Sequence, residues 1–386
     1  MAHDGNKGLS PTGWLPDRVA VGLLATAFPA DLIDQVVDAT DTRELRRRLL
    51  PARLVVYFVL ALWLFRSRNC GYGQVMAKLM DGLWHQRRGD SLLAEPDWRP
   101  PNVSSLSRAR AKLGPDPLRL LFEQLAGPLG TAGEPGVFCC GLRVISVGDS
   151  VADLPATPEN GAFFGWPAPE PHHAAFPQVR WVVAAESGTG ALTGATFGPA
   201  SATAQSLIPG LRPAFEPGAL VLAGPGVLGY ALAREVLATG AHICWLARTA
   251  GPWQPVRMLA DGSCLAELVP AQPGGGPPVT VRVIDCPRAG PGWPPGRSCL
   301  VTDLLDVARY PAAELAGAYL SRWDCEAVIG DHRTDMGEGQ PVLRSRDPAG
   351  SAQEMWALFA VYQALNAMAS VPATSLDRRS SKTLAC

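Results

Sequence analysis

The sequence has little charge and lacks a long apolar run. Only 18% of its 386 residues are charged, 47% are hydrophobic and the mean hydropathy is +0.08. A chain of this composition can bury sizeable cores, which excludes a protein that is disordered as a whole. The longest apolar stretch covers residues 54–65, well short of the roughly 20 residues that a membrane-spanning helix needs. We therefore expect a buried helix there and no membrane as a partner.

Disulfide and zinc patterns are also missing. The nine cysteines contain no C-x-x-C pair, their number is odd, and no secretory signal sequence is recognisable. These features favour reduced thiols in a cytoplasmic protein. The pair His172-His173 has no cysteine or carboxylate at zinc-ligand spacing, and no G-x-S-x-G segment indicates a serine hydrolase.

The length allows two or three domains, because single cores rarely exceed about 150 to 250 residues. The net charge of −1 hides an asymmetry, since residues 1–119 contain 17 Lys/Arg and 12 Asp/Glu, whereas the rest contains 17 and 23. A basic first third suits docking of a polyanion, although an ordinary solvated surface has the same composition.

The first third is helical by pattern. Apolar residues recur at helical spacing between residues 16 and 130, which predicts a helical N-terminal domain over residues 14–126. The segment 101–105 supplies a proline and a hydroxyl N-cap for a basic helix that ends at Gly114. That helix carries Arg108, Arg110 and Lys112. It could enter a DNA groove, or it could be a surface helix with solvated arginines.

The remainder is predicted to be α/β. Short β-branched runs alternate with helical segments, as in an α/β domain, and a β-rich insertion follows at about 250–298. The tail 371–386 is predicted to be disordered. The expected strands cover residues 142–147, 179–185, 191–197, 219–223, 242–247, 258–268, 279–284 and 299–305, and the expected helices residues 202–211, 228–238, 312–334 and 352–369.

One polar stripe carries the most chemical information. Tyr319, Arg322, Glu326 and Arg333 are separated by 3, 4 and 7 residues, so a helix places them along one face. A carboxylate flanked by guanidinium groups suits metal-assisted phosphoryl transfer, in which Mg²⁺ takes oxygen ligands and arginine holds the polyanion. The alternative is an amphipathic helix with an internal Arg-Glu pair.

This stripe resembles the Tyr-Arg-Glu-Lys signature of the DDE transposases of the IS-four insertion-sequence group, with Arg333 where the family has lysine. The similarity extends to segments 15–18, 175–180, 342–345 and 353–356. It implies a ribonuclease H-like domain over residues 138–370. In that family two aspartates and a glutamate bind two Mg²⁺ ions that promote phosphodiester cleavage and strand transfer.

The resemblance also implies roles for residues and partners. Glu326 would be the catalytic and metal-binding glutamate, and Tyr319, Arg322 and Arg333 would contact phosphates. The basic helices of the first 119 residues, including Arg108, Arg110 and Lys112, would bind the terminal inverted repeats of double-stranded DNA. A homodimer on DNA is the corresponding assembly.

Two positions depart from the family pattern. Gly148 and Gly224 stand where the two catalytic aspartates belong. Asp149 is a candidate catalytic residue and metal ligand, but a one-residue offset in a strand turns a side chain to the opposite face unless the backbone bulges. Asp153 resembles a family position but is interpreted as a turn residue. We therefore expect a transposase that is catalytically impaired, or a non-catalytic DNA-binding remnant that inhibits an intact relative.

A competing motif overlaps the second position. Gly224, Gly226 and Gly229 form a G-x-G-x-x-G between a predicted strand and a predicted helix, and Arg248 ends the next strand. This pattern is typical of dinucleotide binding, with the arginine suited to the 2′-phosphate of NADP. Against it, the Gly/Pro-rich sequence after Arg248 offers no helix to continue a doubly wound sheet.

Overall fold

The computed structural model describes residues 17–44, 50–65, 70–86, 101–167, 176–224, 229–248, 253–270, 276–286, 298–322 and 343–370. The chain divides into two compact units. The first, here called the helical unit, comprises residues 1–126, 152–178 and 330–386, and the second, the sheet unit, comprises residues 127–151 and 179–329.

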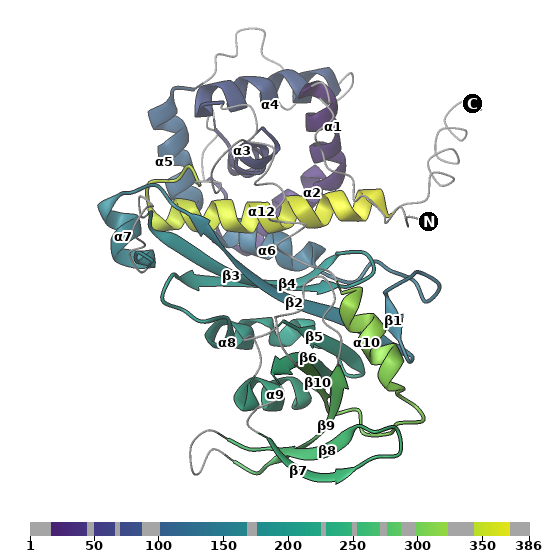
Figure 1. Cartoon of the computed structure of the whole chain (residues 1–386). Helices are drawn as coiled ribbons and strands as arrows, with labels where there is room; N and C mark the ends of the chain where they lie inside the picture. Colours follow the sequence, from purple (N-terminus) through teal and green to yellow (C-terminus); the bar gives the residue numbers. More distant parts are fainter. Residues whose placement is uncertain are drawn as a thin grey trace, which may run out of the picture. The chain divides into compact units, whose positions relative to one another are not determined.

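The helical unit contains one long C-terminal helix, α12, which runs past α3 (Figure 1). This helix is apolar on nearly all sides, so other helices must surround it. Helices α3 and α6 pack directly on it, and Phe122 of α6 lies 5.8 Å, centroid to centroid, from both Trp356 and Phe359. The helices are α1 (Asp17–Ala27), α2 (Ala30–Ala39), α3 (Ala52–Leu64), α4 (Tyr72–Gln86), α5 (Val103–Leu113), α6 (Asp116–Leu125), α7 (Pro158–Phe164) and α12 (Pro348–Ala369).

The helical unit is thus larger than the segment 14–126 expected from the sequence. Helices α7 and α12 belong to it, because the apolar surface of α12 is covered by the N-terminal helices. Within the described part of the chain, no single helix is long and apolar enough to cross a membrane, although the bent pair Ala20–Ala27 and Ala30–Ala39 passes the same criteria together.

Helix α5 begins and ends close to the expected signals. Its N-cap is Asn102, whose side-chain oxygen accepts a hydrogen bond from the Ser105 amide (2.8 Å). The cap is therefore an amide and not the hydroxyl that we expected. Gly114 ends the helix with φ +68°, a left-handed conformation that glycine adopts without strain.

The sheet unit is organised on a sheet of mixed direction. The strand order is β4-β3-β2-β5-β6-β10-β9-β8-β7, and β1 pairs with β2. β5 is parallel to both β2 and β6, whereas β10, β9, β8 and β7 continue the sheet antiparallel. The strands are β1 (Phe138–Cys139), β2 (Leu142–Asp153), β3 (Gln178–Glu186), β4 (Leu192–Pro199), β5 (Ala219–Ala223), β6 (His242–Arg248), β7 (Trp253–Met258), β8 (Cys264–Leu268), β9 (Val279–Cys286) and β10 (Ser298–Thr302).

Helices cover both faces of the parallel strands (Figure 1). One face packs on helix α8 (Ala204–Leu207), a 3₁₀ helix (Ile208–Ala214) and helix α9 (Tyr230–Leu237). The other face packs on helix α10 (Ala312–Leu320). Successive strand residues alternate between these two layers, because side chains of a strand point to opposite faces in turn.

The structure differs from several of the expected elements. The helix expected over 312–334 ends at Leu320 with Ser321 as its C-cap, so Arg322 of the polar stripe lies beyond α10. Strand β2 extends to Asp153, six residues beyond the predicted end, because β3 pairs along it. The predicted strand 258–268 contains a turn, with Gly262 at φ +81°, and only its first residue, Met258, and residues 264–268 lie in strands, β7 and β8 respectively. The predicted helix 202–211 is split into α8 and a 3₁₀ helix with prolines at 209 and 213, where the missing amide and the ring disfavour regular α-helix.

Candidate active site

The candidate active site lies where β5 ends beside the middle of β2. These strands are parallel and paired from Arg143 with Ala219 to Val147 with Ala223. Gly148 and Gly224 directly follow the last pair, on strands that lie about 4.8 Å apart. The two positions at which aspartates were expected are therefore neighbours, on the side where β5 ends, and ligands of open α/β sheets bind outside the carboxyl ends of parallel strands.

The alternation of side chains shows which face these positions occupy. Val144 of β2 and Leu222 of β5 contribute to the layer under α10, whereas Val147 and Ala223 contribute to the opposite layer. Counting by twos from Val144 and Leu222, positions 148 and 224 fall on the α10 face. Carboxylates at both positions would therefore face the helix that precedes Glu326.

Helix α10 is anchored at this edge by Tyr319. The Tyr319 side chain is fully buried, and its hydroxyl donates a hydrogen bond to the carbonyl oxygen of Ala223 (3.2 Å), the residue before Gly224. The Arg322 guanidinium stacks on the Tyr319 ring at 4.3 Å and donates to the Tyr319 carbonyl oxygen (3.2 Å). The phenol thus anchors the helix on β5, and direct contact of Tyr319 with DNA stays a prediction.

Burial raises the pKa of Tyr319 to about 12, despite the opposing effect of Arg322. A phenol whose pKa is raised on folding stabilises the fold below its unfolded pKa of about 10, and this stabilisation is lost as the pH rises towards 12. Between pH 9 and pH 11 we expect the wild-type chain to lose about 1 kcal/mol more unfolding free energy than Tyr319→Phe. Urea unfolding at the two pH values measures this difference. Equal losses of unfolding free energy in both chains would contradict the raised pKa of Tyr319.

Two residues of the polar stripe, its glutamate and its second arginine, are not described. Glu326, Arg333 and residues 225–228 lie outside the described residues. Among the described residues, no three His, Cys, Asp or Glu side chains are grouped so as to hold a metal ion. The glycines at 148 and 224 offer no side-chain oxygen, so these two positions do not fit a two-metal site.

Asp149 lies on the opposite face from Tyr319. Its carboxylate pairs with the guanidinium of Arg180 on β3, at 2.6 Å. The carboxylate of Asp153, within β2 and not in a turn, accepts a hydrogen bond from the Gln178 side chain (2.8 Å). Both acids thus make cross-strand contacts, and a metal-binding role for Asp149 stays a prediction.

The three basic residues of α5 have different surroundings. Arg108 and Lys112 are exposed, whereas the Arg110 side chain is only 5% exposed. Among the described ion pairs, none joins Arg108 or Lys112 to a carboxylate, whereas Arg110 pairs with Glu354. Their placement suits a phosphate contact for Arg108 and Lys112 and argues against one for Arg110.

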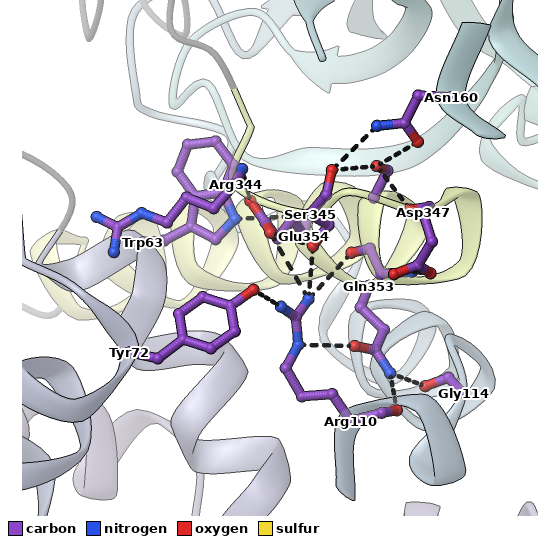
Figure 2. Close-up of polar contacts among 12 residues, drawn as sticks. Trp63, Tyr72, Arg110, Gly114, Asn160, Arg344, Ser345, Asp347, Gln353 and Glu354 are labelled. Atoms are coloured by element: carbon purple, nitrogen blue, oxygen red, sulfur yellow. Dashed lines mark hydrogen bonds and ion pairs between the residues drawn. The ribbon is translucent and has the colours of Figure 1, made fainter. Parts of the chain in front are cut away.

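Arg110 lies instead at the centre of a buried polar network in the helical unit (Figure 2). Its guanidinium donates to Gln353 Oε1 (3.0 Å) and to Ser345 Oγ (2.9 Å), and it faces the Glu354 carboxylate at 3.6 Å. Glu354, itself 3% exposed, also accepts from the Arg344 amide (2.9 Å). The network further includes Tyr72, Gly114, Asn160, Gly350 and Ser351.

The sequence-based interpretation missed this network. Its signal is the pair Gln353-Glu354 inside a helix that is otherwise mostly apolar, since polar side chains on a buried helix need partners. Burial also raises the pKa of Tyr72, whose hydroxyl accepts from Arg110.

The glycine motif lies between parallel strands, as predicted. β5 leads through Gly224 and Gly229 to helix α9, which crosses to the parallel strand β6 ending at Arg248. The next neighbour of β6 is the antiparallel strand β10. The run of parallel strands therefore stops at β6, whereas a dinucleotide-binding sheet would continue with further parallel strands.

Known proteins resemble the chain as follows. A family model described as "Insertion element 4 transposase N-terminal" matches residues 18–123. Transposase InsG for insertion sequence element IS4 of Escherichia coli (strain K12) is 26% identical over 341 residues, which cover 86% of this chain and 73% of that protein. A cryo-EM structure of the piggyBac transposase synaptic complex with hairpin DNA aligns at a TM-score of 0.45 and 11% identity, over 92% of this chain and 76% of that one.

Proposed function

The chain belongs to the IS4 group of insertion-sequence transposases, and from this premise we propose that it binds the ends of its element but cuts them poorly or not at all. The membership makes it a DNA transposase. The observation that carries the impairment is the adjacency of Gly148 and Gly224 at the point where the pairing of two parallel strands, β2 and β5, ends. Losing preorganised charge at such a site costs a large part of the rate.

The strand order supports a ribonuclease H-like core within this proposal. Three neighbouring strands, β4, β3 and β2, are followed by β5 and β6, which run parallel to β2. That is the arrangement expected of a ribonuclease H-like sheet. Strands β7 to β10 then extend it beyond β6, in the region where the sequence predicted a β-rich insertion.

Double-stranded DNA is the proposed partner of the helical unit. Arg108 and Lys112 are exposed four residues apart on α5, so they lie on one face of that helix and can contact successive phosphates. Arg322 and Arg333 are proposed to bind phosphate, and Glu326 to bind metal, near Gly148 of β2 and the carboxyl end of β5. A homodimer on DNA belongs to the same proposal.

Binding and cutting are tested separately. A gel shift with terminal inverted-repeat DNA at several salt concentrations is expected to show binding with a steep salt dependence. A Mg²⁺-dependent cleavage assay on the same DNA is expected to show no product. Cleavage at the rate of an intact transposase would contradict the impairment, and absence of binding would contradict both the transposase and the inhibitory-remnant hypotheses.

Substitution of Arg108 and Lys112 tests the contact surface. Each of Arg108→Ala and Lys112→Ala is expected to reduce the slope of log affinity against log salt by about 0.9, because one phosphate contact is lost. The matched control is Arg119→Ala on α6, since Arg119 is also exposed but already pairs with Asp116 and Glu123. The slopes are measured by fluorescence anisotropy. If both α5 variants keep the slope of the unsubstituted chain, α5 is not part of the DNA-binding surface.

A further inference from the structure

Two adjacent cysteines form the turn between β1 and β2. Cys139 ends β1 and pairs with Leu142, so that Cys140 and Gly141 make a two-residue hairpin loop. Both loop residues have positive φ, +50° for Cys140 and +80° for Gly141. Such loops favour asparagine, aspartate or glycine, because φ is positive at both positions. A cysteine at the first of them is unusual.

The left-handed turn brings the two thiols together. Neighbouring side chains of a strand point to opposite faces, yet here the Sγ atoms of Cys139 and Cys140 lie 3.9 Å apart. Cys139 is buried, with its Sγ 3.7 Å from the Glu314 carbonyl oxygen in the first turn of α10, whereas Cys140 is half-buried. One thiol is thus partly accessible, and the second lies directly beside it.

The spacing suits one atom that bridges both sulfurs better than it suits a disulfide. Adjacent Cα atoms are about 3.8 Å apart, below the range of roughly 4.4–6.8 Å that disulfides usually require. A single atom bonded to both sulfurs at about 2.3 Å instead holds them roughly 3.3–3.8 Å apart for bond angles of about 90–110°. The observed Sγ–Sγ distance of 3.9 Å is close to the upper end of that range.

We propose that Cys139 and Cys140 form a dithiol site that captures a trivalent arsenical bearing one organic substituent. The described residues provide no group of three or more metal-ligating side chains, and such an arsenical needs only two sulfurs because carbon occupies its third position. Two As–S bonds form as the As–O bonding is broken, and both thiol protons leave with the oxygen as one water molecule. No electrons are transferred.

The reaction does not require a cysteine that is already deprotonated. Burial, and next the neighbouring Cys140, raise the pKa of Cys139 to about 12, so this sulfur stays protonated at neutral pH. The half-buried Cys140 makes the first bond, and Cys139 closes the ring from beside it. Because Cys139, Leu315 and Tyr319 belong to one core cluster, the captured group lies against helix α10.

The test uses the full chain, reduced with a phosphine, and phenylarsine oxide as the probe. We expect one arsenical per chain by intact mass, retained against excess monothiol and released by a small dithiol. In Cys140→Ser the affinity is expected to fall about 100-fold or more, because the second bond is no longer intramolecular. Cys264→Ser, which removes another partly exposed thiol of the same unit, is expected to keep the adduct.

Three results would overturn the proposal. These are equal retention by wild type and Cys140→Ser, release from wild type by monothiol alone, and peptide mapping that finds the arsenic on other cysteines. Thermal unfolding of each variant verifies that it is folded. Cys139→Ala serves as the second variant if Cys140→Ser is not folded, and its adduct must be equally labile.

Discussion

The doubly substituted chain Gly148→Asp with Gly224→Asp is expected to cleave terminal inverted-repeat DNA in the presence of Mg²⁺, which the unsubstituted chain is not. Both positions follow the last paired residues of β2 and β5 and fall on the α10 face. The two new carboxylates would therefore face each other across neighbouring strands, about 4.8 Å apart. Loss of one preorganised charged group costs about 10²–10³ in rate, so we expect a gain of at least about 10³-fold.

The control for this experiment is Gly148→Asn with Gly224→Asn. Asparagine has nearly the shape of aspartate but carries no charge, so it tests the fold of the edge without restoring the anionic ligands. Cleavage is followed on end-labelled DNA with Mg²⁺ and with a chelator. If the aspartate pair binds DNA yet remains inactive, the loss of function extends beyond positions 148 and 224.

Replacing Arg110 by methionine is expected to destabilise the helical unit by about 3–5 kcal/mol, because it leaves the buried Glu354 carboxylate without its cation. The effect is large since both side chains are almost inaccessible, at 5% and 3% exposure. The substitution also removes donors to Gln353, Ser345 and the Gly350 carbonyl. Urea unfolding followed by circular dichroism measures the change.

Arg108→Met is the matched control for Arg110→Met. It alters an exposed arginine on the same helix, and exposed substitutions usually change stability by no more than about 0.5 kcal/mol. The double substitution Arg110→Met with Glu354→Leu removes both buried charges, so it is expected to cost less than the sum of the two single changes. Similar costs for Arg110→Met and Arg108→Met would show that the network contributes little.

Much of the fold could be predicted from residue patterns. The expected strands at 179–185 and 219–223 correspond to β3 and β5, and the helix predicted over 352–369 is most of α12. These elements are long or strongly patterned, so local hydrophobic periodicity decides them. The pattern places one strand over 258–268, where the structure has the end of β7, a turn and β8, because the β propensity of the flanking residues does not show where a strand stops.

The unit to which α12 belongs could not be predicted. Order along the chain suggested that the last helix completes the domain beginning at residue 138, but contacts with α3 and α6 assign it to the helical unit. Packing partners depend on which apolar surfaces meet in space, and a helix that is apolar on nearly all sides has no preferred face to indicate them.

The sequence alone determined the family resemblance, the absence of aspartates at positions 148 and 224, and the alternation of strands and helices. Tertiary structure decided that those two positions are neighbours, that Arg110 is buried while Arg108 and Lys112 are exposed, and that Cys139 and Cys140 face each other. The physical reason is the range of the interactions. Identity and periodicity are local properties of the chain, whereas strand pairing, burial of charge and the direction of a side chain in a left-handed turn depend on backbone geometry and on residues far away in sequence.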